Sequence, residues 1–226
     1  FFQSEDGIRD SSTSRGLGDV YKRQEYDFAV SEMKKRVLEI KKNSAFEMVW
    51  LLEHNSIFTA GTSAKLEDLK NTKVNFQYTG RGGQWTWHGP GQRVVYLMLN
   101  LKNRLQDVKA YVYALEELII LTLKDFHIDG LRINGQPGVW VKDNNGCNKI
   151  AALGIRISSW ITFHGISINV NPNLDEFNNI VPCGIKNSSV TSFYKLGKKI
   201  ALKELDIHLK KNFNKVFGNE GLFKLK

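Results

Sequence analysis

Cysteine and long apolar runs are both scarce in this sequence. Its 226 residues include only two cysteines, Cys147 and Cys183, which exclude a disulfide framework and favour a reducing compartment. The densest apolar run, residues 118–123, is followed at once by Lys124 and Asp125 and is far shorter than the roughly 20 residues that span a bilayer. The first residues lack the apolar segment of a secretory signal. These absences predict a cytoplasmic protein that makes no use of a membrane.

Negative charge is also in short supply. Lysine and arginine number 32 against 23 acidic residues, and the formal net charge is +9. Residues 195–226 alone hold nine lysines against Glu204, Asp206 and Glu220. A solvated helix face explains this excess, and the alternative is an attractive field for an acidic partner. Nucleic acid is not expected, because the basic residues are not interleaved with aromatic residues and no nucleic-acid-binding motif is present.

Three segments divide the chain by composition. Residues 1–24 are rich in Ser, Gly, Asp and Arg, show no apolar periodicity, and end in a stretch that resembles a translated sequencing-library adapter. We expect them to be a non-native or disordered adapter-like tail, and the alternative is a natural flexible tail. Residues 25–218 carry the periodic pattern of one folded domain, and residues 219–226 are expected to be a C-terminal tail.

Apolar periodicity predicts three helices and at least five strands. A helix is expected from residue 25 to about residue 42, with Phe28, Met33, Val37 and Ile40 on one face. A second helix is expected over residues 108–126, opened by Asp107 as a cap, with an apolar stripe of Val108, Val112, Leu115, Ile119 and Leu123. A third is expected over residues 200–216. Strands are expected at residues 48–52, 93–99, 138–141, 150–157 and 161–170. Strands flanked by a few helices indicate a single α/β or α+β domain.

A glycine-rich stretch at residues 80–92 is the most unusual part of the sequence. Five glycines and Pro90 indicate unusual backbone angles or a close approach to a ligand, and the residues between them predict a short strand. Trp85 and Trp87 would share a face of that strand and could wall an apolar pocket. Two tight turns around an edge strand would explain the glycines without a ligand. They would not explain why Arg, Gln, Thr and His gather in the same place.

Cys183 and Lys149 are the candidate reactive pair. A lone cysteine is most often an inert core residue, but Pro182 and Gly184 favour a loop position open to reaction. A thiol of ordinary pKa is mostly protonated at neutral pH and needs a nearby cation to become a nucleophile. Lys149, at the head of an apolar strand, could supply that cation, although such a lysine is usually directed to solvent.

The histidines do not predict a metal site. His54, His88 and His164, taken with Cys183, lack the close spacings of zinc ligands, so no metal is expected.

Three ordered blocks make the chain resemble the octanoyltransferases of lipoate synthesis, the lipoate-protein ligase B family. The first block, RGGQWTWHGPGQ at residues 81–92, is close to the family pattern RGG-x-x-T-[YW]-HGPGQ. The second joins GVWV at 138–141 to KIAALGIR at 149–156, and the third joins FHG at 163–165 and NVNP at 169–172 to PCG at 182–184. Ordered motifs of this length are far more specific than one short pattern.

The resemblance implies a fold similar to the biotin and lipoate ligase catalytic domain, with a larger and a smaller mixed sheet flanked by helices. It implies an acyltransferase that moves an octanoyl group from octanoyl acyl carrier protein to a lysine of lipoyl domains through a cysteine thioester. The acceptors would be lipoyl domains of 2-oxoacid dehydrogenases and the glycine cleavage H protein. No cofactor is implied, and we expect a monomer.

The resemblance also implies roles for individual residues. Cys183 would carry the acyl thioester, and Lys149 would lower the pKa of its thiol. The implied substrate-binding residues are Arg81, Gly82, Gly83, Gln84, Trp85, Thr86, Trp87, His88, Ala152, Leu153, Gly154, Gly165, Ile166 and Ser167. Two other readings remain open: an ATP-dependent lipoate or biotin ligase on the same scaffold, and a non-catalytic module that binds acyl carrier protein.

Overall fold

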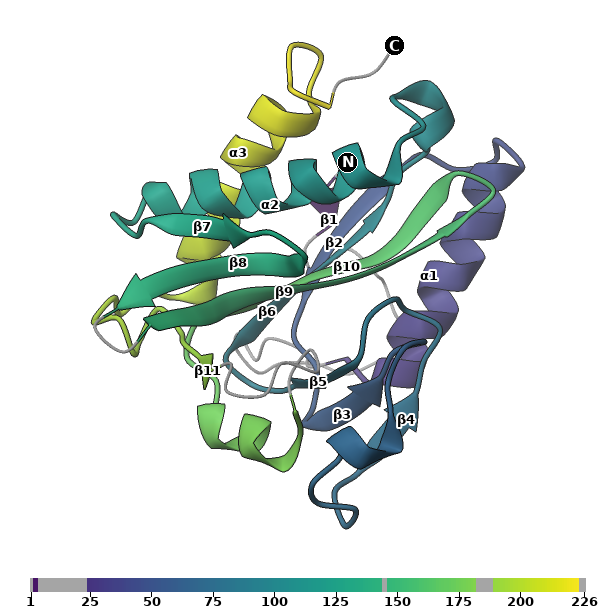
Figure 1. The fold of residues 1–226 in the computed structure, drawn as a ribbon. Coiled ribbons are helices and arrows are strands. Elements are labelled where there is room, and N and C mark those ends of the chain that lie inside the picture. Colours follow the sequence, from purple (N-terminus) through teal and green to yellow (C-terminus); the bar gives the residue numbers. More distant parts are fainter. Residues whose placement is uncertain (1, 4–23, 144–145, 182–188, 224–226) are drawn as a thin grey trace, which may run out of the picture.

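The computed structural model describes residues 2–3, 24–143, 146–181 and 189–223, which form two sheets and three long helices (Figure 1). The helices are α1 (Tyr26–Lys41), α2 (Val108–Lys124) and α3 (Leu202–Phe217). This arrangement confirms the predicted mixed α+β domain with a larger and a smaller sheet. Within the described ranges, no helix combines the length and the apolar character needed to cross a membrane.

The larger sheet holds most of the strands. Their order across the sheet is β1 (Phe2–Gln3), β2 (Met48–Leu52), β6 (Gln92–Met98), β10 (Ile161–Asn169), β9 (Gly146–Ser158), β8 (Gln136–Asp143) and β7 (Gly130–Ile133). A short strand, β11 (Ser189–Val190), also pairs with β9. The β1–β2 and β11–β9 pairs are parallel, and the other pairs are antiparallel.

The smaller sheet has the order β4 (Phe76–Tyr78), β3 (Ile57–Ala60), β5 (Trp85–His88). Its own core is aromatic, with Phe58, Trp85, Trp87 and Phe177 all buried. The glycine-rich stretch at residues 80–92 contains β5 and runs into the start of β6, so it connects the two sheets.

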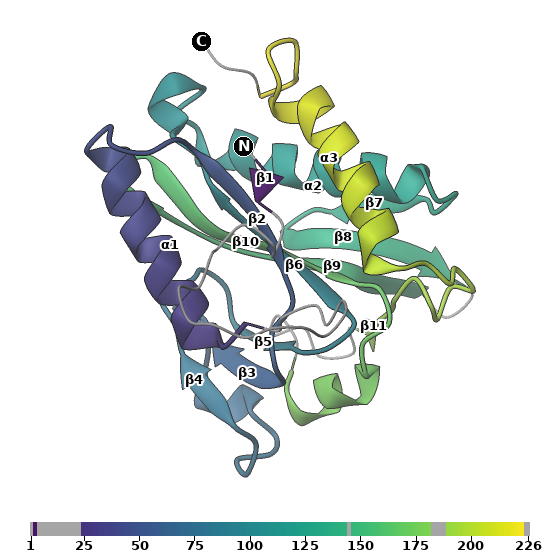
Figure 2. The same ribbon diagram turned by 180° about the vertical axis from the view of Figure 1, so that it is seen from behind.

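Alternate residues of the larger sheet face two different cores. The odd-numbered residues of β2 and β6, such as Leu51 and Val95, pack with α2 and α3. The even-numbered residues, such as Trp50 and Tyr96, pack with α1. Helices α2 and α3 therefore cover one face of the sheet, while α1 lies on the other face, toward the smaller sheet (Figures 1 and 2).

The three helices and five strands predicted from periodicity are present, with two side chains placed differently. Asp107 caps α2 as predicted, because its carboxylate accepts from the backbone N–H groups of Lys109 and Ala110. Phe28, predicted on the buried face of α1, is 42% exposed. It lies five residues before Met33, about 0.4 of a turn away from the buried stripe. Val108 is likewise exposed, at the first turn of α2.

The structure also describes parts of the N-terminal segment that we expected to be a tail. Phe2 and Gln3 pair with Val49 and Trp50 at the edge of β2, and Gln24 forms a bridge with His54. The edge of β2 therefore carries a short strand.

Candidate active site

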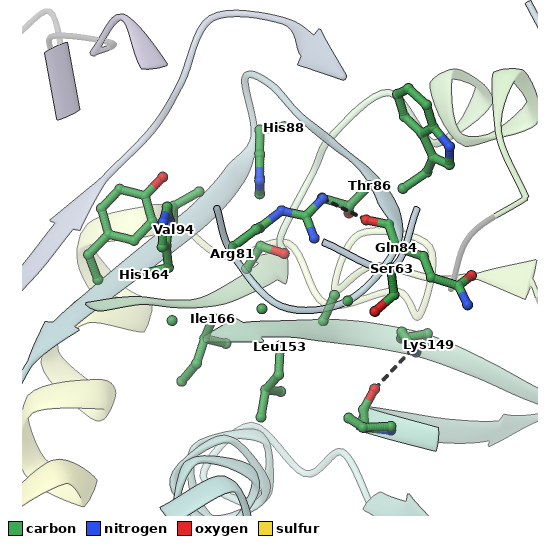
Figure 3. Close-up of a pocket in the computed structure, with 18 of the residues that line it drawn as sticks. Ser63, Arg81, Gln84, Thr86, His88, Val94, Lys149, Leu153, His164 and Ile166 are labelled. Atoms are coloured by element: carbon green, nitrogen blue, oxygen red, sulfur yellow. Dashed lines mark hydrogen bonds between the residues drawn. The ribbon is translucent and has the colours of Figure 1, made fainter. Parts of the chain in front are cut away.

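A cavity of about 310 Å³ lies between the larger sheet and the glycine-rich stretch at residues 80–92 (Figure 3). Most of the predicted binding residues line it: Arg81, Gly83, Gln84, Trp85, Thr86, His88, Ala152, Leu153, Gly154, Gly165, Ile166 and Ser167, together with Lys149. Sequence reasoning missed Tyr26, Ser63, Val94, Tyr96, Gly135, Gln136 and Pro137, and considered His164 only as a metal ligand.

The floor of the cavity runs across the strands. It consists of two adjacent rows of paired residues on β9, β10 and β6, namely Gly154–Gly165–Tyr96 and Ala152–Ser167–Val94. The residues on β9 and β10 are small, and those on β6 are larger. Figure 3 shows Lys149 and His164 toward opposite sides of the cavity, with Leu153 and Ile166 between them.

The two glycines of the first row leave little or no room for a side chain. A Cβ on Gly165 would lie 2.2 Å from the carbonyl oxygen of Val95, and its φ is +159°. A Cβ on Gly154 would lie 3.1 Å from Cδ of Arg81. A larger residue at Gly154 would therefore press against the guanidinium stem that covers the floor.

A β-bulge directs Lys149 toward the cavity. Val139 on β8 pairs with Ala151, but the next residue, Trp140, pairs with Lys149, so Ile150 is an extra residue on β9. Ile150 and Ala151 consequently both pack in the core beneath α2 and α3. The extra residue shifts Lys149 onto the face that carries Ala152 and Gly154, the kind of re-aiming that bulges beside active sites provide.

The side chain of Lys149 is 5% exposed and lies against β8. Its Nζ donates to the carbonyl oxygen of Pro137 at 3.0 Å and lies 4.6 Å from the ring centre of Trp140. Gly138 makes this position accessible, because a Cβ there would lie 3.1 Å from Cε of Lys149. The cation is therefore fixed at the cavity wall rather than directed to solvent.

Cys183 lies outside the described residues, but the chain on both sides of it is placed. Val181 donates its N–H to the carbonyl oxygen of Asp68 at 2.7 Å. The chain is described again from Ser189, which pairs with Asn148, and Val190 then pairs with Lys149 itself. Cys147, which we interpreted as incidental, is exposed near the β8–β9 turn.

Arg81 holds the glycine-rich stretch against β3. Its guanidinium donates to the carbonyl oxygen of Thr59 at 2.7 Å, to the Thr59 hydroxyl at 2.8 and 3.2 Å, and to the carbonyl oxygen of Gln84 at 2.8 Å. Its side chain also lines the cavity. One residue thus both shapes the loop and brings a positive charge to the site.

Two predicted binding residues lie outside the cavity lining. Trp87 packs in the core of the smaller sheet, with its ring centre 5.7 Å from that of Phe177, and its indole N–H donates to Ser56. Trp85, on the same face of β5, packs there too but still reaches the cavity edge. Gly82 is bound to β9, because its N–H donates to the carbonyl oxygen of Ile155.

A hydrogen-bond chain fixes the wall at β6. Nδ1 of His54 lies 2.8 Å from the carbonyl oxygen of Gln24, so this nitrogen carries the proton. Nε2 of His54 lies 2.7 Å from the Tyr96 hydroxyl and therefore accepts from it. Burial lowers the pKa of His54 to about 4 and raises the pKa of Tyr96 well above its ordinary value. Both rings are therefore neutral at pH 7.

His88 and His164 are two further neutral histidines at the cavity. Nδ1 of His88 lies 2.7 Å from Oε1 of Gln92, whose amide nitrogen donates to Asn169. Nδ1 of His164 has no hydrogen-bond partner among the described residues, and its φ of +58° is left-handed. Burial, with a smaller contribution from the charge of Arg81, lowers the pKa of both histidines to about 3.

Nothing in the described part of the chain forms a metal site. There, no group of three or more His, Cys, Asp or Glu residues is arranged to hold an ion.

Comparison with solved structures places the fold. A lipoate-protein ligase A bound with ATP matches with a TM-score of 0.63 and 11% identity, over 86% of this chain and 83% of the other. A bipartite lipoate protein ligase from Thermoplasma acidophilum matches with a TM-score of 0.62 and 13% identity, over 85% of this chain and 80% of the other. At these identities the likeness shows the fold alone.

Sequence comparison shows the family. Residues 25–214 match the family described as lipoyl protein ligase A/B catalytic domain. An octanoyltransferase of Bartonella tribocorum is 50% identical over 204 residues, covering 86% of this chain and 83% of its own length. An octanoyltransferase of Parvibaculum lavamentivorans is 50% identical over 198 residues, covering 85% of this chain and 88% of its own length. The chain therefore belongs to the octanoyltransferase branch of the lipoyl protein ligase A/B catalytic domain family.

Proposed function

We propose that this acyltransferase moves an octanoyl group from octanoyl acyl carrier protein to a lysine of a lipoyl domain, through a thioester on Cys183. The observation that carries the proposal is the placement of Lys149. The β-bulge directs it into a cavity of small floor residues, and the chain that follows Cys183 pairs with Lys149 at Val190.

The first half-reaction exchanges one thioester for another. The Cys183 thiolate attacks the carbonyl carbon of the donor, and the bond from that carbon to the phosphopantetheine sulfur breaks. The released thiolate takes a proton from the Lys149 ammonium, which becomes a neutral amine. Bonds of the same kind are made and broken, so the step needs no nucleotide. The nearby ammonium of Lys149 favours the thiolate form of Cys183 and so raises the fraction of reactive enzyme.

The second half-reaction forms an amide. The amine of the acceptor lysine attacks the enzyme thioester, the carbon–sulfur bond breaks, and Cys183 leaves as a thiolate. The acceptor ammonium loses two protons on its way to the amide. The Lys149 amine, neutral after the first half-reaction, accepts one of them and becomes an ammonium again, and the other passes to solvent. An amide is more stable than a thioester, so this step proceeds toward product.

The proposed partners are acyl carrier protein as donor, and lipoyl domains of 2-oxoacid dehydrogenases and the glycine cleavage H protein as acceptors. The lysines of α3 would attract an acidic donor at low ionic strength. Charge reversal at Lys210 and Lys211 tests this contact. Loss of the salt dependence of the first half-reaction supports it, and an unchanged salt dependence places the contact elsewhere.

The intact mass of the protein after incubation with octanoyl acyl carrier protein tests the thioester. We expect an octanoyl adduct that is absent in Cys183→Ala, is retained in the matched control Cys147→Ala, and is discharged by a lipoyl domain. Lys149→Met should form the adduct much more slowly at neutral pH and recover as the pH rises.

The two rival functions give different results in the same assay. An ATP-dependent ligase would form no adduct from the carrier and would require ATP and free acid to modify the lipoyl domain. A non-catalytic binding module would bind the donor equally well with or without the Cys183 thiol. Either result in folded protein would overturn the proposal.

A further inference from the structure

The floor of the cavity crosses the strands, and this direction determines what limits its length. The strand pairing places β9, β10 and β6 side by side beneath it, and Pro137 adds a residue of β8. Neighbouring strands lie about 4.8 Å apart, so the floor from β8 to β6 is about 14 Å long. An extended ligand on this floor would pass over Ala152, Gly154 and Gly165, which leave room for it.

The floor ends at β6. The next strand is β2, whose Trp50 pairs with Tyr96 and whose Leu52 pairs with Val94. Both β2 residues are fully buried beneath α1, in the cluster that contains Met33, and neither lines the cavity. Tyr26, the first residue of α1, also lines the cavity, and its ring centre lies 5.2 Å from that of His54, the hydrogen-bond partner of Tyr96. A chain that crosses β9 and β10 therefore meets Tyr96 and Val94.

Tyr96 cannot easily move out of the way. Its hydroxyl donates to Nε2 of His54 at 2.7 Å, and His54 is itself fixed by the carbonyl oxygen of Gln24. Its ring packs edge-on against Trp50 and His164, with ring centres 6.3 and 5.9 Å away. Because the hydroxyl is engaged with His54, the part of Tyr96 that remains for the cavity is apolar ring surface.

We infer that Tyr96, positioned by His54 and assisted by Val94, is the stop that sets the length of the acyl chain. This inference rests on the proposed function, because it places the thioester carbon beside Lys149 and the methyl end of the chain at β6. The histidine supports the stop without touching the substrate, and Tyr96 and Val94 contact the chain end.

Donors with acyl chains of different lengths test whether Tyr96 and Val94 limit the chain length. Hexanoyl, octanoyl, decanoyl and dodecanoyl acyl carrier proteins are compared by the rate of adduct formation. Tyr96→Leu and Val94→Ala open space at β6, so both should shift the preferred donor to longer chains. The decanoyl-to-octanoyl ratio should rise by about fourfold for each additional methylene that becomes buried. Tyr96→Phe keeps the ring but removes the hydrogen bond to His54, so its decanoyl-to-octanoyl ratio should lie between those of the wild type and Tyr96→Leu.

Binding of the free fatty acids of the same lengths to the Cys183→Ala protein separates this inference from the proposed chemistry. A shift in the order of fatty-acid affinity in Tyr96→Leu and Val94→Ala, while the wild type forms no adduct, supports the role of Tyr96 in chain length and contradicts the thioester mechanism. If adducts form normally but both folded variants keep the wild-type order of chain lengths, the stop is overturned. Val94→Ala removes little volume, so the test does not depend on Tyr96→Leu folding well.

Discussion

Gly138 on β8 lies against the side chain of Lys149 on β9, so that a Cβ at this position would crowd the lysine. A Cβ on Gly138 would lie 3.1 Å from Cε of Lys149 and 2.7 Å from the carbonyl oxygen of Ala151. The φ of Gly138 is +126°, which other residues rarely adopt. The position of the Lys149 cation therefore depends on a glycine of the neighbouring strand.

Gly138→Ala should displace Lys149 and slow the first half-reaction. The displaced ammonium would favour the thiolate of Cys183 less, so the alkylation rate of that thiol should fall at neutral pH by about tenfold or more and recover at higher pH. The rate of modification by iodoacetamide as a function of pH, read by mass at Cys183, checks this.

Gly146→Ala is the control for backbone strain. Gly146 has nearly the same φ, +123°, on the same hairpin, but a Cβ there meets nothing within 4 Å. This variant should lose stability without changing the pH profile of Cys183. Equal profiles in both alanine variants would mean that Gly138 does not act through Lys149.

Arg81→Lys should weaken donor binding although it keeps the charge. Lysine cannot reproduce the fork that joins Thr59 to Gln84, so the stretch that covers the cavity should loosen. We expect the KM for octanoyl acyl carrier protein to rise by roughly tenfold, about 1.4 kcal/mol. Steady-state kinetics check this.

Arg156→Lys is the matched control for that variant. Arg156 donates one hydrogen bond to the same stretch, at the carbonyl oxygen of Gly80, from an exposed position. Its replacement should change KM much less. A similar rise in both variants would show that loss of any arginine near the stretch has this effect.

Sequence periodicity predicted the long elements because each carries enough apolar residues to define its buried face. The missed strands β1, β3, β4, β7 and β11 are two to four residues long, and pairing with neighbours rather than local pattern makes them strands. The motif blocks led to most cavity residues. Tyr26 and Tyr96 were missed because they reach the cavity from α1 and β6, where single residues carry no local signal.

The direction of the Lys149 side chain could not be predicted from the sequence either. Alternation along an unbroken strand would place Lys149 with Ala151, on the face that packs with α2 and α3. The bulge at Ile150 reverses this, and it exists only through the register of β8 against β9. Trp85 and Trp87 share one face of β5, as predicted. Trp87, however, packs in the core of the smaller sheet and does not line the cavity.

Stability should fall as the pH drops below neutral, because three buried histidines resist protonation. Burial lowers the pKa of His54 to about 4 and those of His88 and His164 to about 3. In the unfolded chain each imidazole has its ordinary pKa of about 6.5. Between that value and the lower pKa of the folded protein, the unfolded state therefore binds more protons than the folded state. The stabilisation is present above about pH 6.5 and is lost progressively toward pH 3, by at most about 1.4 kcal/mol per histidine per pH unit.

Urea unfolding of the wild type and His164→Gln at pH 7 and pH 5.5 checks this. The variant should lose less stability over the interval, since it has one buried imidazole fewer. His127→Asn removes an exposed imidazole and keeps a residue that tolerates the left-handed φ of +57°. A pH dependence of His164→Gln equal to that of the wild type would contradict the assignment.

Asp206→Ala should be among the most destabilising single substitutions on α3. Nε of Arg93 lies 2.9 Å from Asp206, and the arginine side chain is 1% exposed, so the variant removes a carboxylate from a buried guanidinium. Burial raises the pKa of Asp206 even though Arg93 opposes this, which shows how far water is excluded from the pair. We expect a loss of about 3–5 kcal/mol in the free energy of unfolding, recovered in large part by combining Arg93→Met with Asp206→Leu. Glu67→Ala, which breaks an exposed pair with Lys65, should cost less than about 1 kcal/mol. If the double variant is no more stable than Asp206→Ala, the cost arises from lost packing of α3 and not from the buried charge.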